Sequence, residues 1–214
     1  QASSDGDDIV VYRDGRTMPL RFLRNQEAKD DNAPNLCLSD YIAPLASGVE
    51  DHIGLFVVSA DLDESKMAEY RSDDYSNIMI RILCDRIAEA AAEYLHLKIR
   101  KEYWGYSADE SLGPEELFRN GYRGIRPAPG YPACPDHTEK GVIFDLLDAE
   151  ENIGVSLTEN YAMVPVSSVS AYLFSHPRSA YFNIGKIGSD QLKDYASRKN
   201  ITFEEASRWL SQNI

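Results

Sequence analysis

The chain has 214 residues, of which 43% are hydrophobic, and a formal net charge of −13, so its length and apolar content suit one globular domain and exclude a disordered chain. The negative charge disfavours nucleic acid as a partner, because it repels phosphate backbones, and no apolar run approaches the roughly 20 residues that cross a bilayer. Three cysteines, Cys37, Cys84 and Cys134, are too few for a disulfide framework and predict a reducing, cytoplasmic compartment.

The first 60 residues predict short strands. Asp7–Arg13 and Met18–Leu23 flank the turn signal Asp14-Gly15 and predict a hairpin. Leu36–Pro44 is apolar enough to be buried, and the continuous apolar run Gly54–Ala60 is typical of a central strand.

A helical period begins weakly after Leu62 and becomes strong from Tyr75 onward. Its apolar residues recur at spacings of three and four: Ile78, Ile82, Cys84, Ile87, Ala88, Ala91, Leu95 and Ile99. No Gly or Pro interrupts this pattern before Tyr103, so we expect one long helix over about 74–103. Its alanine-rich middle allows close packing against a sheet.

The remainder of the chain mixes short helices and strands. Pro114 with the acids that follow it predicts a short helix, and Asp136 with Glu139 has the spacing of a capping box for another. Three strands and two helices are then expected: strands over Val155–Leu157, Ser168–Phe174 and Ala180–Ile187, the last two paired as a hairpin, and helices over Ser189–Lys199 and Phe203–Ser211. The predicted fold class is α+β, a twisted antiparallel β-sheet with packed helices.

The segment Arg126–Lys140, RPAPGYPACPDHTEK, predicts a stiff loop that holds a small ligand. Its prolines fix φ at about −65° and keep their predecessors extended. Gly130 would let a ligand approach the backbone, Tyr131 offers a stacking face, and Arg126 has a planar fork suited to a carboxylate or ribose. The alternative is a merely structural connection between helices.

Two further pairs of side chains could face a ligand. One ring of Tyr181 and Phe182 could stabilise a sulfonium by a cation–π contact, and the alternative is an ordinary aromatic packing pair. Glu89 and Asp85, one turn apart on the long helix, could present carboxylates to a cationic group, and the alternative is a solvated helix face.

A metal site is not expected. Cys134 and His137 have the spacing of half a zinc site, but a closed site needs four ligands and no second Cys/His pair appears. The common motifs of hydrolases and nucleotide-binding proteins are also absent from the sequence.

Five segments together resemble the C-terminal activation domain of cobalamin-dependent methionine synthase, over nearly the whole chain. They are DDYSNIM at 73–79, DRIAEAAAEYLH at 85–96, YWGY at 103–106, RPAPGYPACPDHTEK at 126–140 and FSHPRSAYF at 174–182. The resemblance implies a domain that binds S-adenosylmethionine beside the cobalamin-binding module of the same enzyme. It further implies repair of oxidised cobalamin to methylcobalamin, with an electron from flavodoxin or an equivalent reductase and a methyl group from S-adenosylmethionine.

The resemblance assigns ligand contacts to seven residues of the loop, the aromatic pair and the long helix: Arg126, Ala128, Gly130, Tyr131, Tyr181, Phe182 and Glu89. Arg126 would contact the methionine end, the loop backbone would hold the adenine, and the aromatic pair would lie near the sulfonium. No side chain is assigned a role as acid, base or nucleophile, because methyl transfer to cobalt depends on alignment of donor and acceptor.

The family domain begins before Gln1, so the resemblance implies that residues 1–214 are an activation domain without its N-terminal portion, which contributes an aspartate to the ligand site. The parent enzyme transfers a methyl group from methyltetrahydrofolate to homocysteine, and this piece would not be catalytic alone. The alternative function is an interaction module that docks the cobalamin module and flavodoxin without binding a ligand.

Overall fold

The computed structural model describes residues 1–29, 33–70 and 72–214. Its strands are β1 (Ala2–Asp5), β2 (Asp8–Arg13), β3 (Arg16–Arg21), β4 (Gly54–Ser59), β5 (Ser156–Leu157), β6 (Met163–Val164) and β7 (Ser168–Leu173). Its helices are α1 (Glu64–Ala68), α2 (Asp74–Lys98), α3 (Pro114–Phe118), α4 (Lys140–Leu147), α5 (Ala149–Ile153), α6 (Ser189–Lys199) and α7 (Phe203–Trp209). The α+β class is confirmed, but the strands form three small antiparallel sheets, β1–β2–β3, β4–β7 and β5–β6, in place of one.

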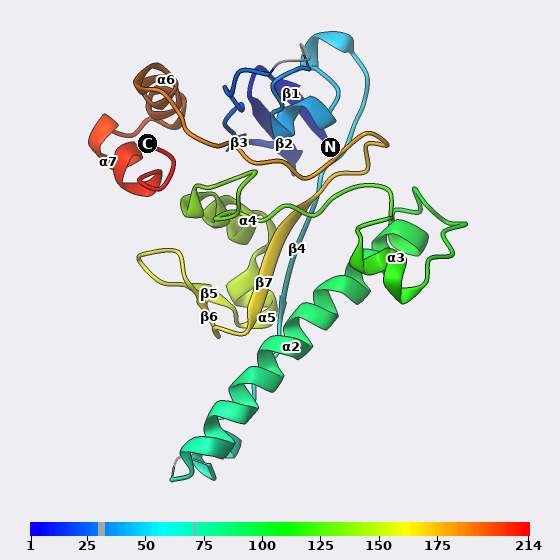
Figure 1. Ribbon diagram of the computed structural model, residues 1–214, viewed down its shortest axis with the longest axis vertical. Helices are drawn as coiled ribbons and strands as arrows, with labels where there is room; N and C mark the ends of the chain where they lie inside the picture. The colour runs from blue at the N-terminus through cyan, green and yellow to red at the C-terminus, as the bar shows by residue number, and fades with distance from the viewer. Residues whose placement is uncertain (30–32, 71) are drawn as a thin grey trace.

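Figure 1 shows how these elements are arranged. The strands β4 and β7 run through the middle of the molecule, and the β1–β2–β3 sheet lies at one end with α6 and α7 beside it. The C-terminal end of α2 approaches α3, whereas its N-terminal half extends to the far end of the molecule (Figure 1). No helix among the described residues is long and apolar enough to cross a membrane.

The predicted N-terminal hairpin is confirmed as β2 and β3. Asp14 and Gly15 both have positive φ, 51° and 75°, as a two-residue turn of the mirror-image type requires. Ile9 and Leu20 pair across the hairpin and are fully buried. The sequence did not predict β1, whose polar residues conceal an alternation in which Ala2 and Ser4 point inward.

The prediction of a central strand at Gly54–Ala60 is wrong, because β4 has β7 as its one strand neighbour among the described residues. Both faces of the pair are nonetheless covered. Phe56 packs with Ala92 of α2, while Leu55 packs in the main core that contains Ile143 of α4. Burial on both faces explains why this strand is apolar along its length.

The predicted long helix is confirmed as α2 followed by a π-helical turn at Ile99–Tyr103. The face that packs against the sheets consists of small residues, since Ala88 and Ala92 are fully buried. Of the large apolar residues in the predicted period, Leu95 and Ile99 pack beside Ala92, whereas Ile78, Ile82 and Ile87 are exposed. Small side chains let the helix approach the strands closely, so they form the inner face.

The predicted hairpin between Ser168–Phe174 and Ala180–Ile187 is also wrong. β7 forms and pairs with β4, but residues 180–187 form no strand. Their backbone is bound by other partners: Ile184 N–H donates to Pro132 O at 2.9 Å, and the Asn25 side-chain amide donates to Asn183 O at 2.7 Å. These tertiary bonds replace a strand ladder.

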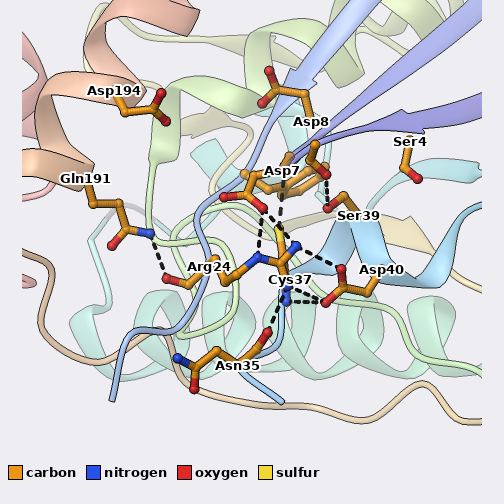
Figure 2. Close-up of polar contacts among 12 residues, drawn as sticks. Ser4, Asp7, Asp8, Arg24, Asn35, Cys37, Ser39, Asp40, Gln191 and Asp194 are labelled. Carbon is orange, nitrogen blue, oxygen red and sulfur yellow. Dashed lines mark hydrogen bonds and ion pairs between the residues drawn. The ribbon is translucent and has the colours of Figure 1, made fainter. Parts of the chain in front are cut away.

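A polar cluster around Arg24 joins the N-terminal sheet to its surroundings (Figure 2). Arg24 Nε donates to Asp7 at 2.8 Å, and both terminal nitrogens donate to Asp40 at 2.7 and 2.8 Å. The Arg24 carbonyl accepts from Gln191 of α6 at 2.6 Å. Although burial opposes it, hydrogen bonds from Arg24 and the Cys37 amide lower the pKa of Asp40. The bonds of this cluster are internal and hold α6 against the chain that leaves β3.

Candidate functional site

A pocket of about 280 Å³ lies between the stiff loop, β7 and α2. Six of the seven predicted site residues line it: Glu89, Arg126, Ala128, Tyr131, Tyr181 and Phe182. Val169 and Ala171 of β7 also line it, two residues apart and therefore on one face of the strand. The structure thus brings together three segments that are far apart in the sequence.

Arg126 enters the pocket wall from the start of the loop. Its Nη2 donates to Glu93 Oε2 of α2 at 2.6 Å, while Arg126 Nε and Glu93 Oε1 are buried without a hydrogen-bond partner among the described residues. Burial disfavours the charged form, but the nearby Glu93 carboxylate raises the pKa of Arg126. The guanidinium therefore stays charged beside the pocket with donors not yet used.

Glu93 is a site residue that the sequence analysis missed. It lies four residues after Glu89, so the two carboxylates are neighbours on one side of α2. Glu89 lines the pocket and is exposed, whereas Glu93 is half-buried against Arg126. The i,i+4 spacing was a usable signal, but only the folded loop shows that Arg126 binds one of them.

Tyr181 is fixed to the beginning of the loop. Its hydroxyl accepts a hydrogen bond from the Arg126 backbone N–H at 3.0 Å, while 45% of its surface stays exposed. Phe182 is half-buried and packs against both the main core and the C-terminal helices. Both aromatics border the pocket, although they lie on an irregular segment and not on the strand that was predicted.

Gly130 does not line this pocket but faces a neighbouring cavity with Tyr131 and Pro132. Its N–H donates to Cys134 O at 2.7 Å, so the backbone closes a tight turn within the loop. Its φ is +92°, and a Cβ there would lie 2.2 Å from the His137 ring. Internal packing therefore accounts for this glycine, and its contact with a ligand stays a prediction.

The far end of the loop is anchored by a buried ionic cluster. Lys199 of α6 pairs with Asp136 at 3.0 Å and also with Glu139, and Tyr195 donates to Asp136 at 2.6 Å. Asp136 caps the next helix through Thr138 N–H at 2.8 Å, but the Glu139 carboxylate accepts from Arg21 N–H at 3.0 Å and does not close the predicted capping box. These contacts fix the far end of the loop, and the hydrogen bond from the Arg126 N–H to the Tyr181 hydroxyl fixes its beginning.

Cys134 and His137 have other surroundings than the metal ligands of a zinc site. Cys134 is buried, and burial raises the pKa of its thiol. His137 Nδ1 lies 2.9 Å from Lys140 Nζ, and burial together with the Lys140 charge lowers the pKa of His137. No group of three or more His, Cys, Asp and Glu side chains in the described part of the chain could hold a metal ion.

The pocket suits a ligand with two different ends. Ala128, Pro127 and Pro132 provide apolar surface next to the exposed ring of Tyr131, which favours a flat heterocycle. Arg126 can bind a carboxylate, and Glu89 can attract a cation. The fold and this pocket together define the class of the protein, an α+β domain whose pocket suits a small ligand of mixed apolar and zwitterionic character.

Comparisons with known proteins agree with this class. A sequence model of the family described as vitamin B12 dependent methionine synthase, activation domain, matches residues 1–200. The chain belongs to this family. It is also similar to the crystal structure of the MetH reactivation domain bound to AdoHcy, with 48% sequence identity and a TM-score of 0.94. That match covers 100% of this chain and 67% of the other.

Proposed function

We propose that the pocket between the loop, β7 and α2 binds S-adenosylmethionine, and that this domain uses it to reactivate the cobalamin of a methionine synthase. The observation that carries the proposal is the placement of a charged Arg126 with unused donors beside an apolar wall. The similar MetH domain is bound to AdoHcy, which is S-adenosylmethionine without its methyl group.

The pocket residues fit the chemical parts of this ligand. Arg126 would bind the carboxylate of the methionine end, and Glu89 would attract its ammonium group. The adenine would lie against Ala128 and Tyr131, and the rings of Tyr181 and Phe182 would stabilise the sulfonium by about 0.5–2 kcal/mol. The residues of this chain would orient S-adenosylmethionine for transfer of its methyl group to the reduced cobalt of a docked cobalamin module, which would leave AdoHcy in the pocket.

The proposal extends to the setting of the domain. Residues 1–214 would form the larger part of an activation domain. That domain would belong to a cytoplasmic enzyme that transfers a methyl group from methyltetrahydrofolate to homocysteine. The cobalamin module of that enzyme and a flavodoxin or equivalent reductase would be its partners. The family and the similar MetH domain support the methionine synthase setting.

Isothermal titration with S-adenosylmethionine tests the proposal. We expect Arg126→Ala to weaken binding by roughly 1.5–3 kcal/mol, the scale of a hydrogen bond to a charged group. Arg119→Ala is the matched control, because Arg119 is exposed and lies outside the pocket lining. This control variant should bind like the unmodified chain.

The titration is repeated with a longer chain that carries the remaining third of the relative's domain. Absence of binding to both chains would leave the alternative, a module that docks partners without a ligand. Equal affinity of Arg126→Ala and the unmodified chain would contradict the proposed role of the pocket.

A further inference from the structure

The helix α2 carries a second apolar face that points away from the sheets. We call it the outer face of α2. It consists of six large side chains, each between 39% and 73% exposed: Tyr75, Ile78, Met79, Ile82, Leu83 and Ile87. The opposite face is already buried, with Ala92 packed against residues of β4 and β7 and Ala88 also buried. The helix is therefore apolar on two sides.

The exposed side chains form one continuous patch. Tyr75, Ile78 and Ile82 follow each other at spacings of three and four, and Met79, Leu83 and Ile87 at spacings of four, so each row occupies successive turns. This part of the helix extends to the far end of the molecule (Figure 1). A surface helix normally keeps a polar outer face, and a contiguous exposed apolar patch marks an interface.

The composition of the patch favours a permanent cover over a transient partner. The six side chains are apolar, and Arg86, four residues after Ile82, is an exposed charged side chain beside them. Surfaces that must separate in water are more polar than permanent interfaces. The patch is also aligned along the helix with one residue of the ligand pocket. Ile82 lies seven residues before Glu89, on the same side of the helix, and Glu89 lines the pocket.

We propose that the outer face of α2 is covered by the part of the reactivation domain that corresponds to the unmatched third of the relative's chain. The relative matches all of this chain at a TM-score of 0.94, yet a third of its own length lies outside the match. A segment of the same polypeptide could cover the patch permanently. The cobalamin module and a reductase would each have to dock and then leave, so the patch would be exposed to water whenever they are absent.

The substitution Leu83→Lys tests this proposal in two chains. One is the 214-residue chain, and the other is joined to the remaining third of the relative's domain in its own order. Leucine and lysine have similar helix propensity, so we expect no change in the thermal midpoint of the 214-residue chain. In the joined chain the lysine would be buried, and the midpoint should fall by at least about 4 °C.

The control is Phe118→Lys, which removes an aromatic of α3 that is even more exposed than Leu83 and should leave both midpoints unchanged. An unchanged midpoint for Leu83→Lys in the joined chain would overturn the proposal, as would an equal fall in both chains. So would a dimer of the 214-residue chain in light scattering that Leu83→Lys dissociates, because a second copy would then be the occupant.

A photo-crosslinking residue at position 83 of the joined chain gives a readout that does not depend on the stability of a variant. We expect peptide mapping to place the crosslink within the remaining third of the domain. A crosslink to another copy of the chain, or none, would overturn the proposal. Neither readout requires S-adenosylmethionine, so failure here is distinguishable from failure of the proposed ligand site.

Discussion

Two arginines near the C-terminal half of α2, Arg100 and Arg126, differ in the number of side-chain hydrogen bonds they make and in their exposure. Arg100, in the π-helical turn, is fully buried and donates through Nε and Nη2 to both oxygens of Glu110 at 2.8 and 2.7 Å. It also lies 4.2 Å from the centre of the Tyr122 ring. Arg126 makes one side-chain bond, to Glu93, and its side chain is 20% exposed beside the pocket.

The difference separates a structural ion pair from one that is available to a ligand. The Arg100–Glu110 pair closes the loop that follows α2 and uses both carboxylate oxygens. Arg100 Nη1 is also buried without a hydrogen-bond partner among the described residues, but Arg100 does not line the pocket. The Arg126–Glu93 pair leaves a donor and an acceptor unpaired next to a cavity. Unsatisfied buried polar atoms are costly, so their position beside a pocket points to a ligand that pairs with them.

The largest expected effect is on stability at Arg100. Arg100→Met would leave the buried Glu110 carboxylate without its partner, which typically costs about 3–5 kcal/mol. Urea unfolding measures this loss. A loss below about 1 kcal/mol, the scale of an exposed pair, would remove the distinction between the two arginines.

His96 of α2 is close enough to both arginines for their charges to act on its pKa. Burial, with the charges of Arg100 and Arg126, lowers the pKa of His96 to about 3. The unfolded chain binds this proton near pH 6.5, so stability is full above that pH and is lost as pH falls toward 3. Between pH 7 and pH 5 the free energy of unfolding should fall by about 2 kcal/mol because of this histidine.

Urea unfolding of His96→Gln at both pH values measures this contribution as a difference from the unmodified chain. We expect the variant to lose less stability between pH 7 and pH 5. If both chains lose the same amount, His96 is not held neutral by its surroundings.

The smallest expected effect on stability is at Arg126. Arg126→Ala removes a pair whose side chains are 20% and 35% exposed, and water can enter the space that the arginine leaves beside Glu93, so the free energy of unfolding should change by less than about 1 kcal/mol. A loss as large as that of Arg100→Met would make Arg126 a structural residue.

Local patterns predicted those parts of the fold that depend on neighbouring residues. The period of apolar residues predicted α2, and the prolines around Gly130 predicted a stiff loop. The inner face of α2 was not predictable from hydrophobicity, because both faces are apolar. Close packing selects the alanines, while the larger side chains remain outside.

Contacts between distant residues set the limit of the sequence analysis. The pairing of β4 with β7 joins segments that are far apart in the sequence, and the irregular course of 180–187 depends on bonds to Pro132 and Asn25. No local pattern contains either set of contacts. The residues of the pocket were predicted better than the pairing of the strands around them. A resemblance to a family identifies side chains directly, whereas strand pairing has to be inferred.

The most direct test of the ligand site is a crystal structure of this domain grown with AdoHcy. Our account predicts the ligand carboxylate within hydrogen-bonding distance of Arg126 and the adenine against Ala128 and Tyr131. Density for the ligand in the neighbouring cavity at Gly130 and His137, with the pocket at Arg126 empty, would contradict it.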